Sequence, residues 1–162
     1  MIHIRRAGPV DARAMATLLN TIIEKGGTTA LVDPVTEHVL HDWMQTDRSA
    51  SAWHLAEDDT GALFGFQFLG PHANLPPEAC DIATFVRIGQ TGLGVGSKLF
   101  EASRAAAHAL GFDWINATIR ADNSGGLAYY QSRGFEDWTR DDNVPLGNGL
   151  TVSKISKRYN LR

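Results

Sequence analysis

Residues 80–111, CDIATFVRIGQTGLGVGSKLFEASRAAAHALG, give the clearest indication of the architecture. The apolar, β-branched part from Ile82 to Ile88 predicts a strand, and the good helix formers that end the segment predict a helix. Between the two lie Gly92, Gly94 and Gly96. A helix start has unpaired backbone N–H groups and the positive end of the helix dipole, so this order predicts a bound anion, typically a phosphate. A glycine-rich connection without a ligand is the alternative interpretation.

Length and composition limit the classes of protein. The 162 residues, 43% of them hydrophobic, suffice for one well-packed domain, so residues 1–162 are predicted to form a single domain. The net charge is −3 and the 15 lysines and arginines are scattered, which argues against nucleic-acid binding. The single cysteine, Cys80, excludes an internal disulfide and a multi-cysteine zinc site.

The N-terminus carries charges where a secretory signal peptide needs an apolar core. No run reaches the ~18 apolar residues of a membrane span. We therefore expect a soluble cytoplasmic protein without a membrane segment.

The sequence before the central segment predicts a strand, two helices and a hairpin. Alternation from Ile2 to Arg6 predicts the strand, and helical spacing of apolar residues predicts a helix from about Val10 to Lys25. The same spacing from Val35 to Met44 predicts a shorter helix. The turn sequence Asp58-Asp59-Thr60-Gly61 predicts a hairpin. Its two strands are Ser51 to Glu57 and Ala62 to Leu69.

The sequence after the central segment continues this mixed pattern. Phe112 to Ile119 predicts a strand parallel to the first through a right-handed crossover, and Asn123 caps a short helix that reaches about Arg133. Two more strands are predicted, at Glu136 to Arg140 and at Leu150 to Arg158. The polar stretch from Asp141 to Gly149 is predicted to be the loop between them. The predicted fold class is therefore mixed α/β (α+β), with a central, mostly antiparallel mixed sheet of about six or seven strands and about four flanking helices.

Two motifs stand in order in this chain. The first, V-x-x-x-x-x-G-x-G-x-G-S, begins at Val86 and ends at Ser97, and the second, N-x-x-x-L-A-Y-Y-x-x-x-G-F, runs from Asn123 to Phe135. Together they resemble the GNAT superfamily of acetyl-coenzyme A dependent N-acetyltransferases, over essentially the whole chain. Asp81, five residues before Val86, makes the chain most similar to the phosphinothricin acetyltransferase-like branch. The resemblance implies a GNAT-like single domain and a homodimer.

Three residues depart from the family pattern. Thr91 stands where arginine or glutamine is usual, Ile88 where proline is common, and Asp81 where glutamate is more usual. The first departure affects a loop that binds mainly through backbone N–H groups, which any residue supplies. The last shortens the reach of a carboxylate base by one methylene.

The resemblance also implies where acetyl-coenzyme A binds. The backbone amides of a six-residue loop are expected to hold its pyrophosphate: Gly92, Leu93, Gly94, Val95, Gly96 and Ser97. The strand edge at Thr84, Phe85 and Val86 is expected to pair with the pantetheine arm as an added strand does, with the Val86 N–H facing the thioester carbonyl. Asn123 is expected to contact the cofactor as well as cap its helix. Side chains at 84–86 that only fill the core are the alternative.

Tyr130 has the family's general-acid position. A phenol of pKa ~10 can give its proton to a leaving thiolate whose conjugate acid has a pKa of ~8.5. Tyr129 lies roughly 100° away around the helix and is expected in the core. A core role is also the alternative interpretation for Tyr130.

Asp81 is the candidate general base. An alkylamine of pKa ~10.4 is mostly protonated at neutral pH and must lose a proton before it attacks. Two other interpretations stay open for Asp81: an anionic site that selects a cationic substrate, and a solvated charge at a strand end. Candidates for the acceptor pocket, which this family builds at the junction of helix and loop, are Glu24, Thr28 and Thr29.

The sequence therefore predicts an enzyme that transfers an acetyl group from acetyl-coenzyme A to a primary amine of a small molecule, by direct attack in a ternary complex. No metal is expected, because the six histidines include only one close helical pair, His38 and His41. Two alternatives remain: a non-catalytic sensor of acyl-coenzyme A, and an acetyltransferase that acts on a protein N-terminus or lysine.

Overall fold

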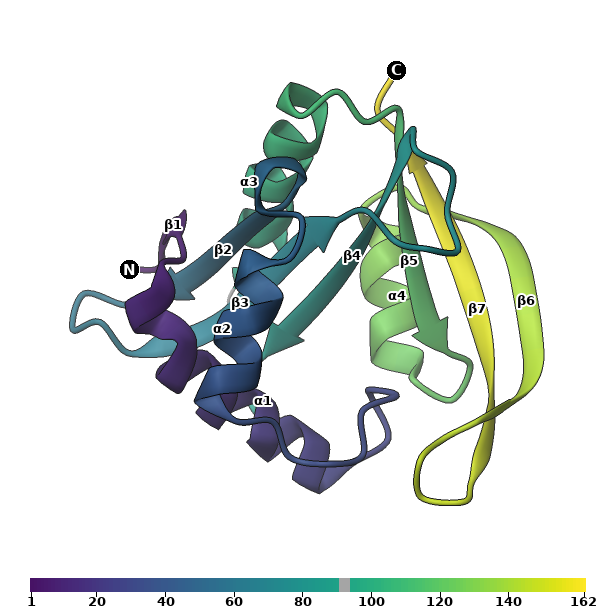
Figure 1. Ribbon diagram of the computed structural model, residues 1–162, viewed down its shortest axis with the longest axis horizontal. Coiled ribbons are helices and arrows are strands. Elements are labelled where there is room, and N and C mark those ends of the chain that lie inside the picture. The colour runs from purple at the N-terminus through teal and green to yellow at the C-terminus, as the bar shows by residue number, and fades with distance from the viewer. Residues whose placement is uncertain (91–93) are drawn as a thin grey trace.

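The chain forms a seven-stranded open sheet with helices on both faces (Figure 1). The computed structural model describes residues 1–90 and 94–162. Within these ranges the strand order is β1-β2-β3-β4-β5-β7-β6, and there are four α-helices. Neighbouring strands are antiparallel except β4 and β5, which are parallel. The predicted mixed, mostly antiparallel sheet and its single parallel crossover are confirmed.

The element bounds agree with the sequence prediction to within a few residues in most places. The strands are β1 (His3–Arg6), β2 (Ala52–Glu57), β3 (Leu63–Gly70), β4 (Ala79–Val86), β5 (Trp114–Arg120), β6 (Glu136–Pro145) and β7 (Thr151–Asn160). The helices are α1 (Ala12–Lys25), α2 (Glu37–Gln45), α3 (Val95–Ala109) and α4 (Ser124–Ser132).

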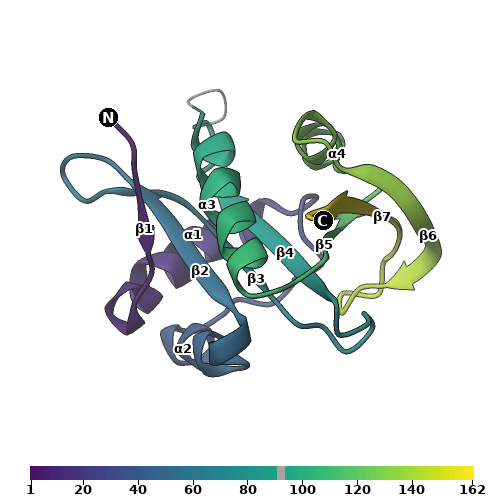
Figure 2. The ribbon, with the colours of Figure 1, turned by 90° about the horizontal axis from the view of Figure 1, so that it is seen from above.

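The helices form a layer on each side of the sheet. Figure 2 shows α1 and α2 on one face and α3 and α4 on the other. The first layer packs on β2 and β3 around the fully buried Leu19, Leu40 and Phe66. The second layer contains a cluster around Phe100 and Ile115. Each face therefore has its own core, as expected when amphipathic helices cover both sides of a sheet.

Local capping explains two of the helix starts. The side chain of Thr36 accepts a hydrogen bond from the Val39 N–H at the start of α2. The side chain of Asn123 accepts one from the Gly126 N–H at 3.0 Å at the start of α4, which confirms its predicted capping role. Such caps pair N–H groups that lack an intrahelical partner.

The predicted loop at residues 141–149 is wrong over its first half, because β6 continues to Pro145. The polar sequence DDNVP was interpreted as a turn, but β6 is an edge strand whose residues are almost all exposed, so polar side chains cost it little. Pairing with β7 compensates through opposite charges, as at Asp141 and Lys154. A register shift after Asp141 and the left-handed Asn143 (φ 57°) accommodate the irregular sequence.

The feature that positions the site is a gap between the two parallel strands. β4 and β5 pair only over residues 79–81 and 114–116. Beyond that point the two strands diverge, and α4 lies behind the opening (Figure 1). Each strand stays paired on its other side, β4 with β3 as far as Val86 and β5 with β7 as far as Arg120.

Candidate active site

On the β4 side of the gap, some backbone groups have no strand partner among residues 1–90 and 94–162. The Arg87 N–H donates to the Phe64 oxygen at 2.7 Å, and this fixes the alternation of the β3–β4 ladder. Alternate residues of an antiparallel strand bond to the same neighbour, so Phe85 bonds to β3 whereas Thr84 and Val86 direct their N–H and C=O groups away from it. These two residues lie beyond the last β5 pair, so their backbone groups face the gap.

Of the three β4 residues predicted to bind the cofactor, two have backbone groups that face the gap and one does not. Thr84 and Val86 have backbone groups available to an extended ligand, as an added strand requires. The backbone of Phe85 is used by β3, and its side chain packs against the α1 layer, at a ring distance of 5.2 Å from Phe66. The structure therefore does not bring Phe85 to the gap through its backbone.

The start of α3 lies next to the gap. Gly94 has a left-handed conformation (φ 75°), and the Lys98 N–H donates to its carbonyl at 3.1 Å. The amides of Val95, Gly96 and Ser97 are therefore the first-turn donors of a 15-residue helix, which suits them to an anion. The predicted contacts at Gly92 and Leu93, and the departure at Thr91, lie outside the described residues.

Gly96 has a packing role in addition to any ligand contact. A Cβ at this position would lie 2.7 Å from Cε1 of Tyr129. The Tyr129 hydroxyl also donates to the Gly96 carbonyl at 2.7 Å. Glycine at this position thus lets α4 approach the first turn of α3, and part of the glycine motif reflects packing.

Tyr130 extends from α4 to β4. Its hydroxyl lies 2.7 Å from Oγ1 of Thr84, and the residue is 6% exposed. Burial raises the pKa of the Tyr130 phenol, and the hydrogen bond with Thr84 opposes this shift. The phenol is therefore protonated at neutral pH and lies beside the strand residue whose backbone faces the gap. It can act as a proton donor there.

Tyr129 is not the simple core residue that the sequence predicted. It is half-buried, and its hydroxyl, besides bonding to Gly96, accepts a hydrogen bond from Nε2 of Gln67 at 3.1 Å. Nε2 of Gln67 also donates to Oγ1 of Thr84 at 2.7 Å. Gln67 has no sequence signal as a site residue, because its contact with Tyr129 spans 62 residues and depends on where α4 packs.

Asp81 occupies the last paired position of β4, opposite Asn116 of β5. Side chains alternate along a strand, so Asp81 and Thr84, three residues apart, point to opposite faces. Nδ2 of Asn116 donates to Oδ1 of Asp81 at 2.9 Å. Burial raises the pKa of the Asp81 carboxyl, and the Asn116 bond only partly opposes this. A carboxylate of this kind is a stronger proton acceptor than an exposed one.

Trp138 of β6 also reaches this position, which the sequence did not predict. Its Nε1–H donates to Oδ1 of Asn116 at 2.9 Å, and its ring meets that of Trp114 edge-on at 5.4 Å. The residue is 47% exposed. Trp138 and Asn116 thus form a fixed wall beside Asp81 on the face away from α4.

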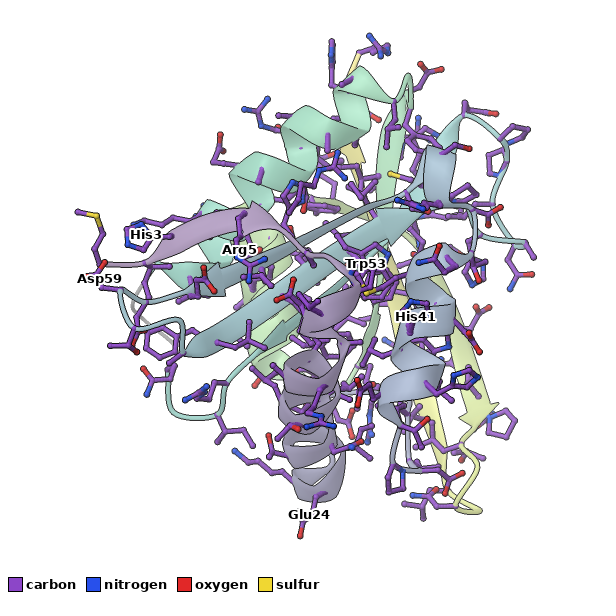
Figure 3. All side chains as sticks on the ribbon, turned by 60° about the vertical axis from the view of Figure 1, so that its left-hand side comes forward. His3, Arg5, Glu24, His41, Trp53 and Asp59 are labelled. Carbon is purple, nitrogen blue, oxygen red and sulfur yellow. The ribbon has the colours of Figure 1, made fainter. Side chains whose placement is uncertain are left out.

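The loop after α1 borders the gap at the end of β5 and the start of α4. The carbonyl of Thr29 accepts from Nη1 of Arg120 at 3.0 Å, and that of Thr28 from Nδ2 of Asn123 at 3.3 Å. The predicted acceptor-pocket residues Thr28 and Thr29 therefore lie beside the start of α4. Glu24 is exposed and points outward from the end of α1 (Figure 3), so the structure does not bring it to this group.

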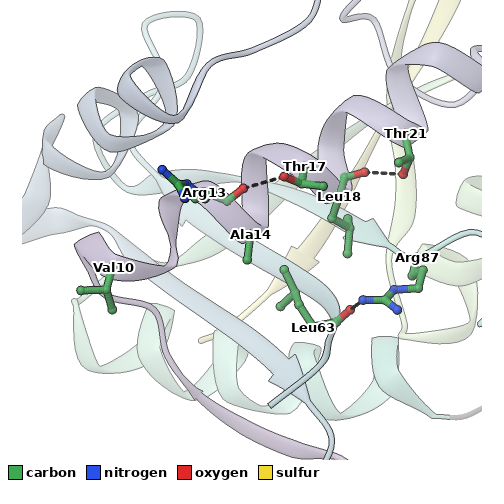
Figure 4. A pocket seen from close by; sticks show the side chains of 8 residues that line it. All are labelled: Val10, Arg13, Ala14, Thr17, Leu18, Thr21, Leu63 and Arg87. Carbon is green, nitrogen blue, oxygen red and sulfur yellow. Dashed lines mark hydrogen bonds between the residues drawn. The ribbon is translucent and has the colours of Figure 1, made fainter. Parts of the chain in front are cut away.

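A cavity of about 560 Å³ lies elsewhere, between α1 and the strand ends at Leu63 and Arg87 (Figure 4). Its polar groups are already paired: Arg87 donates to the Leu63 carbonyl, and Nε of Arg13 donates to Glu37 at 3.2 Å. The described residues that line it include none of those predicted for the site. We therefore place the candidate active site at the gap, where the unpaired backbone groups and the titratable side chains meet.

Other chemistries find little support in the described part of the chain. No cluster of three or more histidine, cysteine, aspartate or glutamate side chains able to hold a metal occurs among the described residues. Burial raises the pKa of the Cys80 thiol to about 12, so a nucleophilic thiolate is disfavoured. Residues 1–90 and 94–162 contain no helix long and apolar enough to cross a membrane.

Comparison with known sequences gives one curated relative, and no family model matches the chain. The relative is the Bacillus subtilis (strain 168) protein YwnH, which is provisionally named a phosphinothricin acetyltransferase. It is 26% identical over 164 residues, which cover 98% of this chain and 94% of YwnH.

Solved structures share the whole fold. An N-acetyltransferase from Staphylococcus aureus Mu50 superposes with a TM-score of 0.90 at 21% identity, over 100% of this chain and 99% of its own. The acetyl-coenzyme A complex of yncA from Salmonella typhimurium, provisionally named an acetyltransferase, superposes with a TM-score of 0.90 at 18% identity. The match covers 100% of this chain and 95% of yncA. A GNAT superfamily phosphinothricin acetyltransferase from Sinorhizobium meliloti, also in complex with acetyl-coenzyme A, superposes with a TM-score of 0.89 at 18% identity. The match covers 98% of this chain and 88% of that protein. At these identities the similarity establishes the fold.

Proposed function

We infer that this chain, which resembles YwnH in sequence and has the GNAT acetyltransferase fold, is an acetyl-coenzyme A dependent N-acetyltransferase of small primary amines. The observation that carries the inference is the gap between β4 and β5. Unpaired backbone groups of Thr84 and Val86 face it, the Tyr130 hydroxyl lies beside it, and Asp81 stands where it opens.

The described residues fit acetyl-coenzyme A. When bound, this molecule supplies an acetyl group activated as a thioester. The first-turn amides of α3 are the donors for its pyrophosphate, and Thr84 offers a strand edge to its extended arm. The Val86 N–H is the donor for the negative charge that develops on the carbonyl oxygen during acyl transfer.

Asp81 and Tyr130 divide the proton transfers between the two faces of the sheet. Asp81, with its raised pKa, accepts a proton from the substrate ammonium directly or through water. Tyr130, protonated at neutral pH, gives its proton to the departing sulfur. The proton that the attacking nitrogen loses as the amide forms returns to the Tyr130 phenolate through water. The amine attacks directly in a ternary complex, because the buried Cys80 thiol is a poor nucleophile.

Amide hydrogen exchange, measured residue by residue by NMR, tests the cofactor site. We expect the Thr84 and Val86 amides to exchange rapidly in the free protein and to become protected when coenzyme A is added. The Ala83 and Phe85 amides bond to β3 in both states and serve as internal controls. Equal protection of all four amides without coenzyme A would contradict an open gap.

Thiol release from acetyl-coenzyme A tests the chemistry. The assay uses a panel of small primary amines together with peptides that carry a free N-terminus or a lysine. Turnover with a small amine supports the proposal, and turnover only with peptides assigns the acceptor to proteins. Amide protection by coenzyme A without turnover on any acceptor identifies a sensor and rejects the enzyme.

We further propose that residues 1–162 form one domain and that the protein is a homodimer, as the family resemblance implies. Light scattering after size exclusion tests the second statement. A mass near 17.6 kDa, that of one chain, would contradict it.

A further inference from the structure

Gln67 is a buried polar side chain in the middle of the sheet. It lies on β3 at 0% exposure, between His54 of β2 and Thr84 of β4 in the register. Its side chain is on the face covered by α3 and α4, because it bonds to Tyr129. A buried amide must find hydrogen-bond partners, so its contacts need an explanation.

The orientation of the Gln67 amide follows from a backbone carbonyl. The Tyr129 hydroxyl lies 2.7 Å from the Gly96 oxygen, which can only accept, so the single phenolic proton of Tyr129 is committed to that bond. The group of Gln67 that faces the Tyr129 oxygen at 3.1 Å must therefore be a donor, which is Nε2. Its second N–H then points to Oγ1 of Thr84 at 2.7 Å.

The Thr84 hydroxyl connects Gln67 to Tyr130. Oγ1 of Thr84 accepts from Gln67, and its other described partner is the Tyr130 oxygen at 2.7 Å. Either oxygen can donate at this distance, and Gln67 occupies one acceptor position of Oγ1 of Thr84. When the Thr84 hydroxyl donates to the Tyr130 oxygen, donors run one way, from Gln67 through Thr84 to Tyr130, and the Tyr130 proton is free to point into the gap.

We propose that Gln67 is a positioning residue, which fixes the direction of this chain so that Tyr130 presents its proton to the gap and its phenolate is stabilised after transfer. The catalytic part rests on the proposed function, whereas the orientation of the Gln67 amide stands on geometry alone. Oε1 of Gln67 has no partner among the described residues, so only the two N–H groups of the Gln67 amide hold it in place.

The test uses the small number of tyrosines. The chain contains three, so incorporation of 3-fluorotyrosine gives three 19F signals, and Tyr130→Phe identifies that of Tyr130. The substitution Gln67→Met keeps the length of the side chain and removes both N–H donors. Without the Gln67 donor, the Thr84 hydroxyl is free to turn its proton away from the Tyr130 oxygen. Because a phenolate that loses a donor is harder to form, we expect the Tyr130 titration to move up by about one pH unit. An unchanged or lowered titration overturns the proposal.

A matched control separates this effect from loss of any buried polar group. Oγ of Ser103, fully buried on α3, has no partner among the described residues, so Ser103→Ala is expected to leave the Tyr130 titration in place. If Gln67→Met does not fold, Thr84→Val breaks the next link and is expected to give the same upward shift. A shift of equal size in Ser103→Ala overturns the specific role of Gln67.

Steady-state kinetics test whether Gln67 also supports the catalytic step. We expect Gln67→Met to lower kcat about tenfold with both KM values within about twofold, since the donor chain supports a step and not binding. An unchanged kcat in an active wild-type enzyme overturns the catalytic role even if the titration moves. A wild-type protein without turnover, together with a shifted titration, rejects the proposed function and leaves the hydrogen-bond direction standing.

Discussion

Replacing Asp81 by asparagine is expected to stabilise the fold at neutral pH and removes the candidate general base. Burial raises the folded-state pKa of Asp81 above its unfolded value, so this carboxyl favours folding only while it is protonated. Its favourable contribution is complete below the unfolded pKa and is lost as pH rises through the folded pKa. Above both values the charged, half-buried group destabilises the protein.

The size of the effect follows from linkage. Each pH unit by which the folded-state pKa exceeds the unfolded value costs about 1.4 kcal/mol of stability at higher pH. Asparagine keeps an oxygen that can accept from Asn116, as Oδ1 of Asp81 does at 2.9 Å, and carries no charge. We expect Asp81→Asn to be more stable than wild type by on the order of 1 kcal/mol near pH 8, and equal to it near pH 3.

Urea unfolding of both proteins from pH 3 to pH 8 measures this difference. We expect the difference in the free energy of unfolding to grow as the pH rises. A wild type that gains stability over Asp81→Asn as pH rises would refute the burial argument, because it would mean that the carboxylate is stabilised in the folded state.

The kinetics of the same variant separate the three interpretations of Asp81. A general base predicts a fall in kcat/KM of about 10²- to 10⁴-fold and loss of the acidic limb of the pH profile. A substrate anchor predicts a higher KM for the amine with kcat retained. A solvated strand-end charge predicts neither change.

Three further substitutions test neighbouring contacts. Tyr130→Phe is expected to lower kcat by about 10²-fold in the thiol-release assay, with coenzyme A affinity by calorimetry within about threefold. Gly96→Ala places a Cβ 2.7 Å from Tyr129 and should cost about 1–3 kcal/mol in urea unfolding, and an unchanged midpoint would show that α4 yields freely. Trp138→Phe removes the N–H that holds Asn116, and we expect the KM for the amine to rise about 2- to 10-fold while the KM for acetyl-coenzyme A stays constant.

The parts of the site that sequence could predict are those fixed by local chemistry. The Asn123 cap depends on an N–H three residues away, and the strand, glycine turn and helix around Gly94 are contiguous. Hydrophobic periodicity predicted most elements on both sides of this segment, because most helices and strands bury one side in a core, unlike the exposed β6. Such features need no knowledge of the tertiary structure.

The residues that sequence missed depend on strand order and helix placement. Trp138 reaches Asn116 because β7, the last strand in the chain, lies between β5 and β6. Gln67 meets Tyr129 because α4 packs behind the gap, from which its tyrosine side chains reach β3 and β4. Neither long-range contact has a local pattern. The continuation of β6 beyond Arg140 was missed for a related reason, since pairing with β7 overrides a turn-like sequence.

The persistence of the gap follows from the way the sheet is divided. β4 is held by β3 from Asp81 to Val86, and β5 is held by β7 along its whole length, so closing the gap would break one of two continuous ladders. The Tyr130–Thr84 hydrogen bond joins the two halves from the α4 face, and Asn116–Asp81 joins them from the other. A chain lying extended in this opening has Asp81 on one side and Tyr130 on the other. Under the proposed function, proton acceptance from an incoming amine and proton donation to a departing sulfur would therefore take place on opposite faces, with both groups in their hydrogen-bonded positions.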